Sequence, residues 1–192
     1  MKKTLLFSAI MSAFAFSAQA SPDLDNLSQL TIIPNHNASL IRNFNPYAVS
    51  RMHTARDFMY EPLVVFNELK GNVPEYRLAT DFRMSEDLLS ITFDLRKGVK
   101  WSDGETFDAD DVVFTFDMVR NYPSLDDRGI NNKIKSVEKL NQYQVRFHMK
   151  EVNTNGTYEI VQVPVVPEHQ WKEVKDPAEF LNPNPIGTGP FT

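Results

Sequence analysis

Two stretches of strict polar and apolar alternation, separated by a helix-like segment, constrain the fold of this chain most. Residues 91–95 and 143–149 each place every second side chain on one face, and all the side chains of that face are apolar. Period two is typical of a β-strand that buries one face. A further strand is expected over residues 134–140, and Asn141-Gln142 fits a hairpin turn to the strand that follows. The pattern therefore predicts antiparallel strands that pack by one face.

The segment between these strands predicts an amphipathic helix that ends near residue 121. Asp108 fits its N-cap, because the carboxylate can accept a backbone N–H of the first turn. Asp110 and Asp111 follow, where the helix dipole favours negative charge. One face is apolar and should pack under the hairpin strands: Val112, Val113, Phe116 and Val119. Strands and helices are mixed without a regular βαβ alternation, so the expected fold class is α+β, with mixed and antiparallel strands and short helices.

β-Branched runs indicate the other strands, and asparagine, glycine and proline indicate loops, turns and the ends of short helices. Strands are expected over residues 30–33, 63–66 and 163–166. Loops or turns are expected over residues 35–46, 71–74 and 122–133. Short helices are expected from residue 54 to Pro62, over residues 158–161, and from Pro167, as first helical residue, to about residue 174.

The first twenty residues have the composition of a secretory signal peptide. Lys2 and Lys3 form a basic start, residues 5–16 are mostly apolar, and Ala18-Gln19-Ala20 is a small-residue cleavage site. The apolar run of about a dozen residues is shorter than the roughly twenty that a membrane span needs. We therefore expect cleavage near Ala20 and Ser21, a location in the periplasm, and a mature chain that is not embedded in the membrane.

The composition of the chain excludes several classes of function. The 192 residues carry a net charge of −5, which argues against nucleic acid as a partner, and the absence of cysteine excludes disulfides and thiolate metal sites. The four histidines lack the spacing of a metal site, so a solvated surface role is favoured for His148. No catalytic or cofactor-binding motif is present. We expect no enzyme activity, no catalytic residues, no bound metal and no cofactor.

Four short motifs occur in a fixed order along the chain. They are YEPLV at residues 60–64, LAT at 78–80 leading through Asp87 to ITFDLRKGVKW at 91–101, SDG at 102–104 followed by Phe107 and Asp111-Val112, and GTGPF at 187–191. Together they resemble the periplasmic solute-binding proteins of ABC importers, in the cluster (family 5) that includes oligopeptide, dipeptide, nickel and cello- or chito-oligosaccharide binders. The motif residues themselves fit scaffold roles, as turns, helix caps and close chain crossings.

The resemblance implies a part of a two-lobed binding protein. Residues 21–58 would be the lead-in with the first strand and loop of lobe one, residues 59–183 a small inserted α+β subdomain, and residues 184–192 a segment crossing back to lobe one. The chain would thus be a truncated, N-terminal part of the first lobe, without the hinge and the second lobe. The implied partners are a small ligand and an inner-membrane ABC permease, with the protein itself a monomer.

The resemblance is strongest to the branch that binds chito- or cello-oligosaccharides, and RNFNP at residues 42–46 is its most particular piece. An oligosaccharide is therefore the first ligand class, and a short peptide is the alternative. A function of another class, an interaction module that signals to a membrane sensor, also stays open.

The loop after the first expected strand holds the candidate ligand-binding residues. Ligands gather beyond the carboxyl ends of strands in open sheets, which points to Arg42, Asn43, Phe44 and Asn45. Arginine and asparagine offer hydrogen bonds suited to sugar hydroxyl and acetamido groups, and an aromatic ring can stack on a pyranose. The alternatives are a core position for Phe44 and turn-forming roles for the asparagines.

Overall fold

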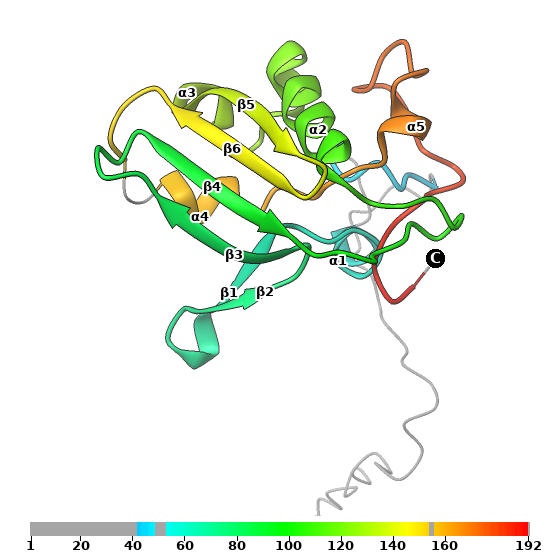
Figure 1. Cartoon of the computed structure of the whole chain (residues 1–192). Helices are drawn as coiled ribbons and strands as arrows, with labels where there is room; N and C mark the ends of the chain where they lie inside the picture. Colours follow the sequence, from blue (N-terminus) through cyan, green and yellow to red (C-terminus); the bar gives the residue numbers. More distant parts are fainter. Residues whose placement is uncertain (1–41, 49–52, 154–155, 192) are drawn as a thin grey trace, which may run out of the picture. The chain divides into compact units, whose positions relative to one another are not determined.

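The computed structural model describes residues 42–48, 53–153 and 156–191 (Figure 1). Contacts divide the chain into residues 1–33 and residues 34–192, and all described residues lie in the second unit. The expected signal peptide and the strand expected over residues 30–33 lie outside the described residues. Among the helices of the described part, none is long and apolar enough to cross a membrane.

A four-stranded antiparallel sheet with the order β3-β4-β6-β5 forms the centre of the described unit (Figure 1). Its strands are β3 (Ala79–Met84), β4 (Ser90–Leu95), β5 (Ile134–Asn141) and β6 (Gln144–Met149). Strands β5 and β6 form the expected hairpin, but its turn is Gln142-Tyr143 and not Asn141-Gln142, because Asn141 still belongs to β5 and pairs with Gln144. On its other side β6 pairs with β4, where Phe93 lies opposite Val145. The alternation along β4 and β6 is confirmed, because their apolar side chains are all buried on one face.

Helix α2 (Ala109–Asn121) packs across the buried face of the sheet and has the expected N-terminus. The Asp108 side chain accepts a hydrogen bond from Asp110 N at 2.8 Å, and Asp111 Oδ2 accepts one from Asp108 N at 3.1 Å. This reciprocal arrangement is a capping box, which satisfies backbone donors that the first helical turn leaves free.

Three phenylalanines join helix and sheet. The Phe116 ring of α2 meets the Phe147 ring of β6 edge-on, with centroids 4.7 Å apart, and Phe147 meets Phe93 of β4 at 5.3 Å. All three side chains are fully buried. The predicted apolar face of α2 is confirmed at Val112, Phe116 and Val119, whereas Val113 is only half-buried.

A smaller two-stranded sheet lies beside the central one. Strands β1 (Val64–Asn67) and β2 (Val73–Tyr76) pair antiparallel and are joined by a 3-10 turn, η1 (Glu68–Lys70). Gly71 and Asn72 close this turn with φ angles of 73° and 62°. The short helices of the described part are α1 (His53–Met59), η2 (Pro123–Leu125), α3 (Ile130–Lys133), α4 (Gly156–Ile160) and α5 (Glu168–Trp171).

The turn expected over residues 71–74 is wrong in its position. The chain turns at η1 and Gly71, so that Val73 and Pro74 already belong to β2. The sequence did not predict strand β3. It is an edge strand whose residues are mostly exposed or half-buried, so it lacks the apolar alternation that marked β4 and β6.

The strand expected over residues 163–166 does not form a ladder. The segment is buried, but Pro164 has no N–H, Val165 N donates to Glu61 O in a loop, and Val166 N donates to the Thr115 hydroxyl at 3.1 Å. A buried β-branched run can satisfy its backbone with such isolated partners instead of a neighbouring strand. The sequence pattern alone does not distinguish the two cases.

The helix expected from Pro167 to about residue 174 is shorter than expected. Pro167 is its N-cap and not its first helical residue, and α5 ends at Trp171. The Trp171 ring is buried edge-on against Tyr47 and Phe180, and Val174 N donates to Trp171 O in a turn. The helix therefore ends at the residue whose side chain packs into the core.

Candidate functional site

The candidate loop of residues 42–45 is held against residues 177–181 by buried asparagine side chains. Asn45 Nδ2 donates to Pro177 O at 2.8 Å and to Phe180 O at 2.7 Å, while Asn45 Oδ1 accepts from Tyr47 N at 2.9 Å. Asn43 Oδ1 accepts from Asn45 N at 3.0 Å. Asn43 and Asn45 are 2% and 0% exposed, so these two amides shape the loop from inside.

Arg42 and Phe44 lie differently in the same loop. The Phe44 side chain is half-buried and packs against the core, while Phe44 N donates to Leu181 O at 2.9 Å. Arg42 is exposed, and its guanidinium carbon lies 5.3 Å from the centroid of the Phe44 ring. The loop therefore presents one cation over an aromatic ring on a backbone that its neighbours hold in place.

Tyr60 and Asn182 support this loop, although neither was predicted as a site residue. The Tyr60 hydroxyl donates to Phe44 O at 3.2 Å and accepts from Asn182 Nδ2 at 2.6 Å. Gln170 Nε2 in turn donates to Asn182 Oδ1 at 3.2 Å. Burial raises the pKa of Tyr60 above its ordinary value, which keeps the phenol neutral and able to donate. Tyr60 belongs to the YEPLV motif, which was the available signal.

We expect Asn45→Ala to lower the free energy of unfolding by about 1–3 kcal/mol, because it leaves buried carbonyl and N–H groups without partners. Chemical denaturation monitored by circular dichroism measures this change. Asn121→Ala, at the exposed end of α2, is the control and should change stability by less than about 0.5 kcal/mol. Equal stability of the two variants would show that the amide of Asn45 does not hold the loop.

The motifs at residues 102–104 and 187–191 meet in space. Ser102 N donates to Gly187 O at 2.9 Å, and Gly189 N donates to Met59 O at 3.0 Å. A Cβ atom at Gly187 or Gly189 would overlap the backbone oxygens of Met59 or Phe58 at the end of α1. The two glycines are therefore required for a close chain crossing over this helix end.

The buried carboxylate of Asp111 joins three segments of the scaffold. Its Oδ2 accepts from Trp101 Nε1 at 3.1 Å and from Asp108 N at 3.1 Å, and its Oδ1 accepts from Glu168 N at 2.9 Å. Asp111 is 5% exposed, and burial raises the pKa of its carboxyl, against the opposing effect of these hydrogen bonds. Its position links the GVKW motif to the starts of α2 and α5.

Three arginines line a hollow of about 580 Å³: Arg56, Arg77 and Arg128. Tyr60, which supports the candidate loop, also lines this hollow. The Arg56 side chain is 12% exposed and lies 3.7 Å from Asp57 and 3.9 Å from Asp127. Asp57 and Glu61 also line the hollow, and Arg77 is paired with Glu75 at 3.4 Å, so acidic side chains offset most of this positive charge. An anionic group of a ligand would find guanidinium donors here.

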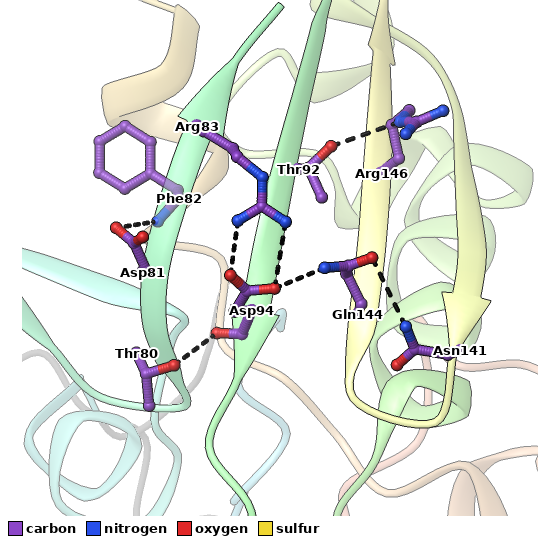
Figure 2. A network of polar contacts seen from close by, with 9 residues as sticks. All are labelled: Thr80, Asp81, Phe82, Arg83, Thr92, Asp94, Asn141, Gln144 and Arg146. Carbon is purple, nitrogen blue, oxygen red and sulfur yellow. Dashed lines mark hydrogen bonds and ion pairs between the residues drawn. The ribbon is translucent and has the colours of Figure 1, made fainter.

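The face of the central sheet turned away from α2 carries a connected row of polar side chains (Figure 2). Arg83 of β3 bonds both carboxylate oxygens of Asp94 on β4, at 2.6 and 3.4 Å. Gln144 of β6 donates to Asp94 at 2.6 Å and lies 3.5 Å from the Asn141 amide. The hydrogen bonds from Arg83 and Gln144 hold the pKa of Asp94 below its usual value. Asp94 and Arg83 are therefore both charged at neutral pH.

Within the part of the chain that the structure describes, no group of three or more His, Asp or Glu side chains is placed to hold a metal ion. His148 lies 3.0 Å from Glu138, and His169 lies 2.7 Å from Asp103, so each is paired with a single carboxylate.

The chain is similar in sequence to binding proteins of bacterial transport systems. Residues 73–192 match the family described as "Bacterial extracellular solute-binding proteins, family 5 Middle". A putative ABC transporter peptide-binding protein of Brucella ovis is 35% identical over 156 residues, which cover 78% of this chain and 29% of that protein. The di/tripeptide-binding protein 1 of Pseudomonas aeruginosa is 31% identical over 72% of this chain and 31% of its own length. The chain thus spans about three tenths of the length of these curated relatives.

A solved structure shows the same fold. The periplasmic oligopeptide-binding protein of an oligopeptide ABC transporter from Thermotoga maritima, crystallised with mannohexaose, superposes with a TM-score of 0.71 at 27% identity, over 78% of this chain and 28% of that one. The fold is therefore α+β as expected and matches a part of a periplasmic binding protein, and the matched proteins are transport binding proteins rather than enzymes. Since the family match covers more than half of its residues, the chain belongs to the bacterial extracellular solute-binding proteins of family 5.

Proposed function

We propose that this chain is the N-terminal part of a periplasmic binding protein that captures a chito- or cello-oligosaccharide for an inner-membrane ABC permease. Residues 1–20 would direct export, and the expected segments 21–58, 59–183 and 184–192 would contribute to the first of two lobes. Capture would occur by closure of the lobes about a hinge, without covalent chemistry and without a cofactor. The whole protein would act as a monomer.

The exposed Arg42 guanidinium over the half-buried Phe44 ring is the observation that carries this proposal. Asn43 and Asn45 are used to hold the loop, which leaves Arg42 as the polar side chain of RNFN that faces outward. A guanidinium offers five N–H donors in one plane, which suits the hydroxyl and acetamido oxygens of a sugar. The loop is already ordered by its bonds to residues 177–181, so ordering it on binding costs little entropy. The sugar-bound relative from Thermotoga maritima is consistent with this ligand class.

A short peptide is the second candidate ligand. The curated relatives are named for peptide binding, and the hollow lined by Arg56, Arg77 and Arg128 suits a carboxylate better than a neutral sugar. Signalling to a membrane sensor is the third possibility. The absence of binding to both sugars and peptides would support it.

We expect Arg42→Ala, made in the longer protein that contains residues 1–192, to weaken oligosaccharide binding by about 1.5–3 kcal/mol, the range for a hydrogen bond to a charged group. Isothermal titration with chito-oligosaccharides, cello-oligosaccharides and tripeptides measures the change and identifies the ligand class. Arg42→Lys keeps the charge but not the planar fork, and it should recover only part of the affinity.

The control is Arg120→Ala on α2, where the guanidinium is paired with Asp117 at 3.0 Å. It should leave ligand affinity unchanged. The melting temperature of Arg42→Ala without ligand should stay close to that of the wild type, because the side chain is exposed. If peptides bind and sugars do not, the ligand class is wrong, and if sugar affinity survives Arg42→Ala, the loop is only a support.

A further inference from the structure

The polar row on the open face of the sheet ends in a hollow of about 590 Å³ near the turn of the β5–β6 hairpin. Its polar and aromatic lining residues are Thr80, Asp94, Arg96, Lys97, Asn141, Tyr143 and Gln144. None of them belongs to the Arg42 loop or to the arginine-lined hollow. The volume lies in the range of small-molecule sites, about 300–1,000 Å³.

The polar side chains of this hollow are held in position by one another (Figure 2). Asp94 is fixed by Arg83 on one side and by Gln144 on the other, with shortest distances of 2.6 Å to both. Gln144 lies between Asp94 and Asn141, and Thr80 Oγ1 donates to the backbone oxygen of Asp94 at 3.2 Å. Side chains ordered in advance lose little further entropy when a ligand binds.

The hydrogen-bonding capacity that remains is mixed in kind. Gln144 and Asn141 each use one amide hydrogen in the row, which leaves each a second amide hydrogen and an oxygen lone pair. The Thr80 hydroxyl keeps its acceptor lone pairs. A ligand that fits this set must both donate and accept at neighbouring atoms, as a row of hydroxyl groups does.

An aromatic ring completes the lining. Tyr143 is half-buried, and the exposed Lys97 holds its ammonium 5.7 Å from the ring centroid. The lysine stem is flexible and can swing aside, so that the ring face becomes available to a pyranose. An ammonium can also donate to ring hydroxyls.

From these observations we propose that the hollow on the open sheet face binds a saccharide unit, at a site separate from the Arg42 loop. A simple anion fits less well, because the Arg96 guanidinium in the lining is already bonded to the backbone oxygens of Arg77 and Tyr76, and the Asp94 carboxylate lies beside the remaining lining cation, Lys97. A peptide strand fits less well, because strand addition needs a free strand edge, whereas Asp94 and Gln144 lie on the two central strands.

The experiment is a titration of the 192-residue chain, ¹⁵N-labelled, with the disaccharides of N-acetylglucosamine and of glucose, followed by amide shifts. For a site this open we expect a dissociation constant of roughly millimolar. The amide signals of residues 94 and 141–144 should move. Gln144→Ala and Thr80→Val should each weaken this binding at least about tenfold, or remove the shift changes, while leaving the spectrum that of a folded protein.

The matched control is Glu138→Gln, which changes a charge on the same sheet face at a residue paired with His148 and outside the hollow. It should leave the shift changes as they are. Arg42→Ala should leave them unchanged as well, which separates this site from the proposed capture loop. The site is refuted if no disaccharide moves these amides at tens of millimolar, about ten times the expected dissociation constant. Loss of the shift changes in Arg42→Ala would assign the binding to the loop, and equal changes with trialanine would refute the ligand class.

Discussion

Replacing Phe116 by alanine is expected to lower the free energy of unfolding by about 3–5 kcal/mol. The ring is fully buried between α2 and the sheet and meets Phe147 edge-on at 4.7 Å. Its removal takes away the burial of an aromatic side chain and leaves a cavity that the surrounding backbone fills only in part. Because whole domains are stable by only about 5–15 kcal/mol, the variant should be close to unfolding.

Chemical denaturation measures the loss directly, and the melting temperature should fall by roughly 6–20 °C for a chain of this size. Val113→Ala on the same helix is the matched control, because that side chain is only half-buried. It should cost less than about 1.5 kcal/mol. A loss below about 1 kcal/mol for Phe116→Ala would mean that this face of α2 does not pack on the sheet.

Asp111→Asn is expected to lower the free energy of unfolding by about 2–5 kcal/mol, although the two side chains have nearly the same shape. All three groups that Asp111 meets are N–H donors: Trp101 Nε1, Asp108 N and Glu168 N. An asparagine must turn its own NH₂ group toward at least one of them, and it removes the negative charge from the others. The joint between the GVKW motif, α2 and α5 is therefore broken at one point.

The pH dependence of this effect has a definite sign. Burial raises the pKa of Asp111 in the folded protein, so between the ordinary value of about 3.9 and the raised value the folded state binds more protons than the unfolded state. The stabilisation from this group is then complete below the ordinary pKa and declines as the pH rises through the raised one. The stability difference between wild type and Asp111→Asn should shrink over that range.

Denaturation of both proteins at a series of pH values that starts below the ordinary aspartate pKa of about 3.9 and rises from there tests this dependence. Asp110→Asn is the matched control, because this neighbour lies in the same helical turn but is exposed and paired with Lys139 at 2.6 Å. It should change stability by at most about 1 kcal/mol. A difference for Asp111→Asn that grows with pH would contradict the direction of the pKa shift.

The candidate loop illustrates how far local sequence reaches into the site. The pattern RNFN correctly predicts a loop at the described residues 42–46 and offers hydrogen-bonding residue types. It does not show that Asn45 bonds to Pro177 and Phe180, because those partners lie more than 130 positions further along the chain. For the same reason the support of the loop by Tyr60 and Asn182 had no local signal beyond the YEPLV motif.

The sequence by itself determined the helices and strands that depend on interactions between residues close together in the chain. The capping box at Asp108 and Asp111, the apolar face of α2 and the alternation along β4 and β6 follow from contacts between residues a few positions apart or from a repeating burial pattern. Only the tertiary structure decided what distant partners do. It left residues 163–166 without a ladder, ended α5 at Trp171 and brought Gly187 onto Ser102. The physical reason is that a buried backbone group needs a hydrogen-bond partner but not a particular one, and distant segments supply it only once the chain has folded.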